Sequence, residues 1–214
     1  EKAGKLPKVL VAVHLCGQPC DMAAIHALGQ KYGFKIIEDA SHAIGGQYKG
    51  EPIGNGRYSD ITVFSFHPVK IITTAEGGMA LTNSAELATR LGLLRSHGIT
   101  RDPAHMTHAP DGPWYYQQVA LGYNYRMTDV QAALGLSQLS RIDAFVQRRH
   151  EIAKRYDAAF AALPNHGVVN GTSVPSIRFT VSPISTAFCA LALYCLRPDS
   201  NSCRLVSPDF GSAA

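Results

Sequence analysis

Residues 65–78 read SFHPVKIITTAEGG and place one lysine, Lys70, in a short loop directly after an apolar strand. A lysine amine is a nucleophile only when it has lost its proton, and a loop packed against apolar strands can hold such an amine against a carbonyl group. Lys70 is therefore a candidate for forming a Schiff base. The alternative, a solvated surface charge, describes most lysines and stays open at this point.

A second informative segment lies upstream, where residues 35–46 read KIIEDASHAIGG. The pattern predicts a buried strand that ends in the carboxylate of Asp39. Open α/β sheets bind ligands at the carboxyl ends of their strands. Pyridoxal phosphate needs a lysine for its aldehyde and an acidic partner for its ring nitrogen, so Asp39 could serve as that partner. On spacing alone, Asp39 could equally cap the turn that follows it.

The remaining elements alternate between strand and helix. Residues 9–14 and 34–38 predict buried strands on either side of a helix over residues 21–32, with Asp21 as its N-cap. This is the β-α-β unit of a parallel sheet, so the fold class is α/β. Residues 60–66 and 77–83 predict two further strands, with Lys70 in the connection between them. Ser84 then caps a helix that runs to about Arg95.

The second half of the chain begins with a long loop over residues 96–122, rich in Gly and Pro and containing the aromatic triplet 114–116. Loops of this length are often functional, so we expect it to border a substrate pocket. Its aromatic side chains could equally pack at a dimer interface. From Thr128 an apolar-periodic segment predicts one long helix, straight or bent, to about Leu163.

Three segments together resemble the DegT/DnrJ/EryC1/StrS family of pyridoxal-phosphate-dependent sugar aminotransferases. They are residues 39–42, residues 65–70 and the motif GYNYRM at residues 122–127. The resemblance runs from about residue 8 to about residue 164. It implies a partial fold-type I large domain over residues 1–126, a three-layer α/β/α arrangement with a mostly parallel sheet, and a long helix over residues 127–164 that leads out of it.

The resemblance also implies a role for each site residue. Lys70 would form the Schiff base and shuttle a proton to the substrate carbon, and Asp39 would keep the ring nitrogen protonated. His42 would lie near the ring's phenolic oxygen, and Ser65 would bind the phosphate. Asn124 would reach across a dimer interface to the partner's phosphate, which makes a homodimer the catalytic unit. From the residues alone, His42 could instead be a core histidine and Asn124 a turn residue.

Within the family, residues 42–46 and 66–78 are most similar to members that act in pseudaminic acid biosynthesis. The implied reaction is ping-pong transfer of an amino group, from L-glutamate by analogy, to the C4 keto group of a UDP-linked 4-keto-6-deoxy N-acetylhexosamine. A related sugar dehydratase carries histidine at the lysine position, so Lys70 argues against that activity. The alternative function outside the enzymes is a non-catalytic remnant or a partner-binding module built on the same scaffold.

Both ends of the chain depart from the family. The segment that would supply a second phosphate-binding residue and an aromatic that stacks on the cofactor would precede residue 1. Residues 172–214 are rich in Ser, Pro and Cys and lack the pattern of the family's small C-terminal domain, so we expect an out-of-frame or otherwise aberrant tail rather than a native domain. We expect the parent protein to be the enzyme and this chain alone to be inactive or poorly active.

Composition agrees with a globular enzyme, because 46% of the 214 residues are hydrophobic and 17% are charged. The net charge of +4 is spread along the chain, which argues against nucleic-acid binding but suits a sugar diphosphate. No apolar run is long enough to span a bilayer. The five cysteines lack the spacing of a zinc site, so we expect no metal and a reduced, cytoplasmic chain.

Overall fold

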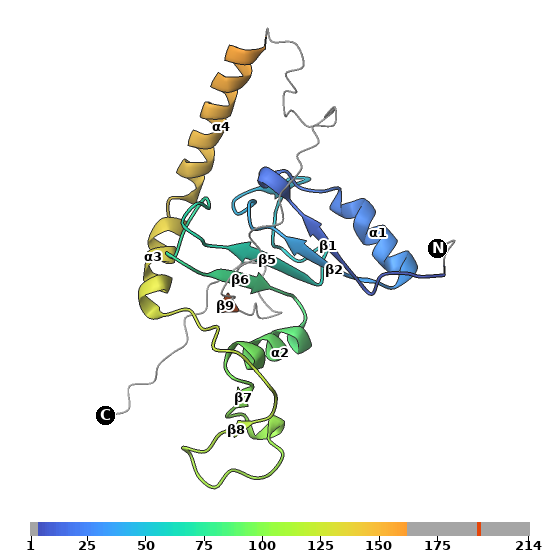
Figure 1. The fold of residues 1–214 in the computed structure, drawn as a ribbon, viewed down its shortest axis with the longest axis vertical. Coiled ribbons are helices and arrows are strands. Elements are labelled where there is room, and N and C mark those ends of the chain that lie inside the picture. The colour runs from blue at the N-terminus through green and yellow to red at the C-terminus, as the bar shows by residue number, and fades with distance from the viewer. Residues whose placement is uncertain (1–3, 162–191, 194–214) are drawn as a thin grey trace.

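The computed structural model describes residues 4–161 and 192–193 and is built on a five-stranded sheet in the order β1-β2-β5-β6-β9 (Figure 1). The strands are β1 (Val9–Val13), β2 (Lys35–Asp39), β5 (Ile61–Ser65), β6 (Gly78–Leu81) and β9 (Ala192–Leu193). The pairs β1–β2, β2–β5 and β6–β9 are parallel, and β5–β6 is antiparallel. The predicted α/β class and mostly parallel sheet are confirmed.

Helix α1 (Met22–Tyr32) connects β1 to β2 and completes the predicted β-α-β unit. The N-cap is Asp21, whose side chain accepts a hydrogen bond from the Ala24 amide at 3.4 Å. The helix ends at Gly33, whose φ of 75° is the left-handed conformation that glycine adopts without strain. A short 3₁₀ turn, Leu15–Gly17, precedes the helix.

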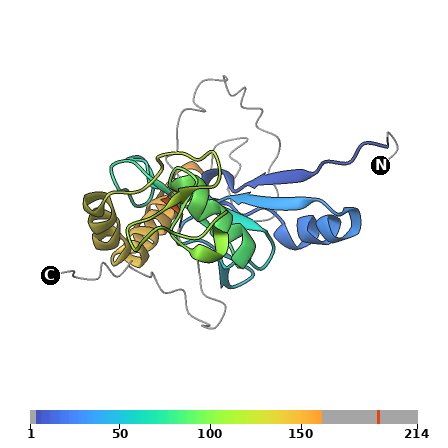
Figure 2. The ribbon, with the colours of Figure 1, turned by 90° about the horizontal axis from the view of Figure 1, so that it is seen from below.

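Two apolar clusters form the core. Met22 of α1 belongs to one, and Leu139 of the helix α3 (Asp129–Leu139) packs against the other; Figures 1 and 2 show these two helices on opposite sides of the sheet. The first packs α1 against β1 and β2 through Ala12, Met22, Phe34 and Ile36. The second contains Ala40, Ala43, Phe64, Phe66 and Ile72. On β1, the alternate side chains Val9, Val11 and Val13 are exposed, because successive residues of a strand point to opposite faces.

Helix α2 (Ala85–Arg95) has the predicted N-cap, with the Ser84 hydroxyl accepting from the Leu87 amide at 3.3 Å. The segment predicted as a long loop contains more structure than expected. The two short strands β7 (Ile99–Thr100) and β8 (Gln117–Gln118) pair antiparallel around a 3₁₀ turn, Pro103–His105. Another small antiparallel pair, β3 (Gln47–Tyr48) with β4 (Glu51–Pro52), follows β2.

The predicted single helix is instead two helices, α3 (Asp129–Leu139) and α4 (Ile142–Phe160). The break falls at Ser140, whose hydroxyl donates to the Ser137 carbonyl at 2.9 Å, and at Arg141, which leaves helical geometry with φ −113° and ψ 7°. The change of direction lets residues of both helices, Leu139, Ile142 and Phe145, pack against the second core cluster. Residues 162–164 of the predicted helix, and residues 172–214 apart from β9, lie outside the described residues.

Candidate functional site

The carboxyl ends of β2 and β5 meet at one edge of the sheet. Asp39 is the register partner of Val63, and the amide of Ala40 donates to the Val63 carbonyl at 2.8 Å. Ser65 ends β5 at this edge, and the connection from β5 to β6 carries Lys70. The topology therefore brings Asp39, Ser65 and Lys70 to the edge where open α/β sheets bind ligands.

The connection that carries Lys70, residues 66–77, is firmly attached to the core. Phe66 and Ile72 are buried in the second cluster. The carbonyl of Phe66 accepts hydrogen bonds from the Thr74 amide at 3.0 Å and from the Thr73 hydroxyl at 2.8 Å. The amide of Lys70 itself donates to the His67 carbonyl at 2.9 Å. The backbone of Lys70 is thus held by a turn whose two ends are fixed.

Helix α3 and a glycine complete this support. The Gln138 side chain on α3 accepts from the Thr73 amide at 2.9 Å, and the Gln131 side chain donates to the Glu76 carbonyl at 3.1 Å. At Gly77, φ is 153° and a Cβ would collide with the Thr74 hydroxyl, so only glycine fits without rearrangement. The structure therefore explains why the first residue of the pair Gly77-Gly78 is glycine.

Asp39 caps the turn after β2, which was one of its two predicted roles. Its Oδ1 accepts from the Ser41 amide at 3.1 Å and from the Ser41 hydroxyl at 2.5 Å. No hydrogen bond to Oδ2 is present among the described residues. The carboxylate is half-buried, so one oxygen fixes the turn while the other remains available to a ligand.

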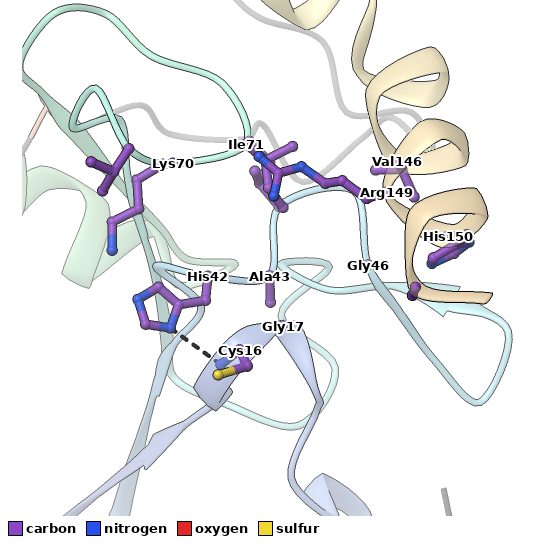
Figure 3. Close-up of a pocket in the computed structure, with 13 residues that line it drawn as sticks. Cys16, Gly17, His42, Ala43, Gly46, Lys70, Ile71, Val146, Arg149 and His150 are labelled. Atoms are coloured by element: carbon purple, nitrogen blue, oxygen red, sulfur yellow. Dashed lines mark hydrogen bonds between the residues drawn. The ribbon is translucent and has the colours of Figure 1, made fainter. Parts of the chain in front are cut away.

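Lys70 and His42 line the same pocket, which has a volume of about 480 Å³ (Figure 3). In this view the Lys70 side chain extends toward the His42 ring. His42 is exposed rather than a core histidine, and its Nδ1 accepts a hydrogen bond from the Cys16 amide at 3.3 Å. The opposite wall is one face of α4, formed by Val146, Arg149, His150 and Ala153.

The other predicted residues are not among those lining the pocket. Ser65 is buried, and Asp39 is the half-buried last residue of β2. Asn124 is exposed, and its backbone forms an isolated antiparallel bridge with Ser96. The structure therefore brings Lys70 and His42 together and leaves Asn124 outside the pocket. Figure 1 places β7 and β8 beyond α2, away from α4, so the 96–122 segment does not border this pocket either.

Sequence reasoning missed Arg149, which contributes a cation to the pocket. Figure 3 shows its side chain reaching from α4 toward Ile71. The neighbouring Arg148 pairs with Glu151 at 2.9 Å, whereas Arg149 forms no ion pair within the described part of the chain. No Asp or Glu is among the described lining residues, so Lys70 and Arg149 make the pocket positive. The Arg-Arg pair in a helical sequence gave no sign of which arginine faces inward.

Two further features are absent from the part of the chain that the structure describes, residues 4–161 and 192–193. No group of three or more His, Cys, Asp or Glu there could hold a metal ion. No helix in that part of the chain is long and apolar enough to cross a membrane.

The chain is similar in sequence to a known family of enzymes. Residues 3–189 match the model of the DegT/DnrJ/EryC1/StrS aminotransferase family, a range that extends beyond residue 164, where the motif resemblance ends. The chain is 45% identical over 157 residues to the spore coat polysaccharide biosynthesis protein SpsC of Bacillus subtilis, covering 73% of this chain and 40% of SpsC.

Solved structures of similar proteins have the same fold over most of the described residues. Helicobacter pylori PseC, an aminotransferase involved in pseudaminic acid biosynthesis, is 35% identical with a TM-score of 0.65, over 72% of this chain and 39% of PseC. The aminotransferase TlmJ of Streptoalloteichus hindustanus is 34% identical with a TM-score of 0.66, over 76% of this chain and 42% of TlmJ. The chain thus spans about two fifths of the length of these relatives.

Proposed function

Because this chain belongs to the DegT/DnrJ/EryC1/StrS aminotransferase family, we propose that it carries the cofactor-binding lysine, Lys70, of a nucleotide-sugar aminotransferase. The whole protein would move an amino group from an amino acid, with L-glutamate the leading candidate, to the C4 keto group of a UDP-linked 4-keto-6-deoxy N-acetylhexosamine. The product would be UDP-4-amino-4,6-dideoxy-N-acetyl-β-L-altrosamine, an intermediate of pseudaminic acid. We propose the cytoplasm as its location.

One observation supports this proposal most strongly. Lys70 lies on a fixed turn at the carboxyl edge of the sheet, and its side chain lines a pocket. The turn is anchored by Phe66 and Ile72 in the core and by Gln138 from α3. Lysine side chains lose conformational freedom when they are held for reaction, and a fixed backbone reduces that cost. A surface lysine with a purely solvating role would need none of this support.

The donor set at this edge fits pyridoxal phosphate. A carboxylate with one free oxygen, Asp39, suits a protonated ring nitrogen, and the hydroxyl of Ser65 suits a phosphate oxygen. His42 brings an imidazole N–H into the pocket beside Lys70. When bound, the cofactor supplies an electron sink for the bond that breaks at the substrate carbon. The second phosphate-binding residue and the stacking aromatic that the family resemblance implies have no counterpart among these residues.

Each side chain then has a chemical role. With the cofactor bound, the Lys70 amine would move a proton from the donor's α-carbon to the cofactor in the first half of the reaction, and from the cofactor to the sugar's C4 in the second half. Asp39 would keep the ring nitrogen of the bound cofactor protonated, because a charged carboxylate stabilises the protonated form of that nitrogen. The donor leaves as its 2-oxo acid before the sugar enters, so one pocket serves both substrates in turn.

The positive pocket supports an anionic substrate. A guanidinium makes paired hydrogen bonds to phosphate or carboxylate groups, and Arg149 faces the pocket without a partner within the described residues. A nucleotide sugar offers a diphosphate, and an amino-acid donor offers a carboxylate. We propose the diphosphate, because Arg149 is placed on α4, across the pocket from the loop that holds Lys70.

A homodimer forms the remaining part of the proposal, with Asn124 acting on the cofactor phosphate of the partner subunit. Its exposed position outside its own chain's pocket is compatible with such a role. The exposed apolar side chains Leu121, Tyr123 and Val130 lie near it in the sequence, and apolar residues are typical of the centre of a dimer interface.

The reaction can be tested by a single half-reaction. The chain is incubated with pyridoxal phosphate and an excess of L-glutamate, and 2-oxoglutarate is measured per mole of protein. We expect at most one equivalent, formed slowly, and none above the free-cofactor background with Lys70→Arg, which keeps the charge but not the nucleophile. Equal production by both proteins would contradict the proposal.

The substrate class can be tested separately by titrating UDP into the cofactor-free chain in a calorimeter. Arg149→Ala should weaken binding about tenfold, because a hydrogen bond to a charged group contributes about 1.5 kcal/mol or more. Arg148→Ala is the matched control, since it removes the same charge one residue away and should leave binding unchanged. Equal weakening by the two substitutions would show a non-specific charge effect and contradict the assignment.

A further inference from the structure

A buried histidine, His14, lies at the end of β1 and links two segments of the chain. Its Nδ1 accepts a hydrogen bond from the Cys20 amide at 3.2 Å, and its Nε2 lies 3.3 Å from Oε2 of the buried Glu38. Because Nδ1 is an acceptor here, the proton must sit on Nε2, which donates to the carboxylate. The same imidazole therefore fixes the chain at residues 14 and 20.

Between these two points the chain makes the tight turn Leu15–Gly17. The amide of Gly17 donates to the His14 carbonyl at 3.1 Å. Cys16 has a φ of 56° and Gly17 a φ of 83°, so two consecutive residues adopt the left-handed conformation. The adjacent Cys20 thiol stays uncharged and donates to the Val13 carbonyl at 3.2 Å, because burial and the nearby Glu38 carboxylate raise the pKa of that thiol.

The turn touches His42 in two places. The Cys16 amide donates to His42 Nδ1 at 3.3 Å, the contact drawn as a dashed line in Figure 3. The backbone of Gly17 packs so closely that a Cβ there would lie 2.9 Å from the His42 carbonyl oxygen. Neither contact uses a side chain of the turn, so both are set by its backbone conformation.

We propose that residues 14–20 position His42 as a hydrogen-bond donor, with Nδ1 occupied by the Cys16 amide and the proton held on Nε2, which is directed into the pocket beside Lys70. A neutral imidazole has one donor and one acceptor nitrogen, so occupying Nδ1 with an amide donor assigns the donor role to Nε2. This inference rests on the proposed function for its purpose: an Nε2–H donor suits an anionic oxygen of a ligand bound at Lys70. Cys16 and Gly17 are then positioning residues.

The test is nuclear magnetic resonance of the ¹⁵N-labelled full chain without cofactor, at a pH of about 8, where an ordinary imidazole is neutral. We expect a ¹⁵N–¹⁵N coupling across the hydrogen bond from the Cys16 amide to His42 Nδ1, with Nδ1 unprotonated and Nε2 protonated. His42→Gln assigns the signals by their loss. Because no cofactor is present, the outcome does not depend on whether Lys70 reacts.

Alanine variants of Gly17 and Gly33 distinguish loss of the contact with His42 from the conformational strain of alanine at a positive φ. Gly17→Ala should abolish the coupling, because its Cβ would push the turn away from His42. Gly33→Ala imposes a similar left-handed cost at φ 75°, has nothing within 4 Å of the added Cβ, and should keep the coupling. Cys16→Asn should also keep it, because asparagine tolerates this φ and retains the amide. A wild-type chain without the coupling, with Nδ1 protonated, or a Gly17→Ala chain that keeps the coupling would overturn the proposal.

Discussion

Two long connections of this chain are built in opposite ways. The connection that carries Lys70, residues 66–77, buries Phe66 and Ile72 in the core and bonds to Gln138 on α3. The excursion over residues 101–116 is held by bonds within itself, such as the 2.6 Å bond between His108 and Tyr115, and by bonds to Gln117 of β8, such as that from the Thr107 amide at 2.7 Å. It leaves Trp114 71% exposed. Catalytic groups need a fixed backbone, and only the first connection provides one.

The two connections should also contribute differently to the stability of the fold. The Lys70 connection is part of the core, so changes in it should cost global stability. The excursion adds a surface bearing exposed aromatic side chains, and changes in it should be almost neutral for the isolated chain. Substitutions matched between the two connections can break this account or sharpen it.

The largest difference is expected between Ile72→Ala and Trp114→Ala. Ile72 is buried, and truncating a buried isoleucine leaves a cavity that costs about 3 kcal/mol of unfolding free energy. Trp114 is exposed, so its larger truncation should cost less than about 0.5 kcal/mol. Urea unfolding of both variants measures the difference. Similar losses would mean that the excursion is packed as firmly as the Lys70 connection.

A smaller difference is expected between Gly77→Ala and Gly112→Ala. At Gly77 an added Cβ meets the Thr74 hydroxyl and a positive φ, which should cost about 2 kcal/mol. At Gly112 the Cβ meets the ring of Trp114, an exposed side chain that can turn away, so the cost should stay below about 0.5 kcal/mol. Thermal unfolding followed by circular dichroism would compare them, and a reversed order would contradict the comparison.

The smallest effect depends on pH and concerns Asp60, just before β5. Partial burial alone would raise the pKa of this carboxyl group, but hydrogen bonds from the Ile36 amide at 2.8 Å and the Lys35 ammonium at 3.0 Å lower it below its ordinary value. A lowered folded-state pKa gives stability that is present above the unfolded pKa of about 3.9 and is lost as the pH falls through the folded value.

Asp60→Asn should therefore cost about 1 kcal/mol at neutral pH, and the difference from the wild type should shrink below a pH of about 4. Asp111→Asn, in the excursion, is the control and should change little at either pH. Unfolding free energies of the three proteins across this pH range provide the measurement. A gap for Asp60→Asn that stays constant with pH would show that its hydrogen bonds do not depend on charge.

Local sequence signals predicted β1, β2, β5 and β6 of the sheet but not β9. Asp21 and Ser84 cap their helices as expected, because capping depends on residues within one turn. The break at Ser140 was missed, since the apolar periodicity continues across it and the cause is packing against a distant core. The pairing of β7 with β8 was missed for a different reason, because two-residue strands are too short to show a periodicity.

The sequence supplied candidate site residues, whose roles stay predictions, but it did not supply their contacts. Lys70 and Asp39 were singled out by their positions after predicted strands, and the resemblance added their roles. The alternative that Asp39 caps a turn is realised. The hydrogen bond from the Cys16 amide to His42 joins residues far apart in the sequence, and no sequence motif predicts it. Arg149 could be distinguished from Arg148 only when α4 was placed against the pocket.

The central claim is that Lys70 is the lysine that binds pyridoxal phosphate, and one measurement tests it most directly. The chain is incubated with the cofactor, reduced with borohydride and digested, and the modified peptides are identified by mass spectrometry, with Lys70→Ala as the control. We predict a pyridoxyl adduct confined to Lys70 and absent from the variant. An adduct that is missing, or that is scattered over surface lysines such as Lys31 and Lys49, would contradict the account.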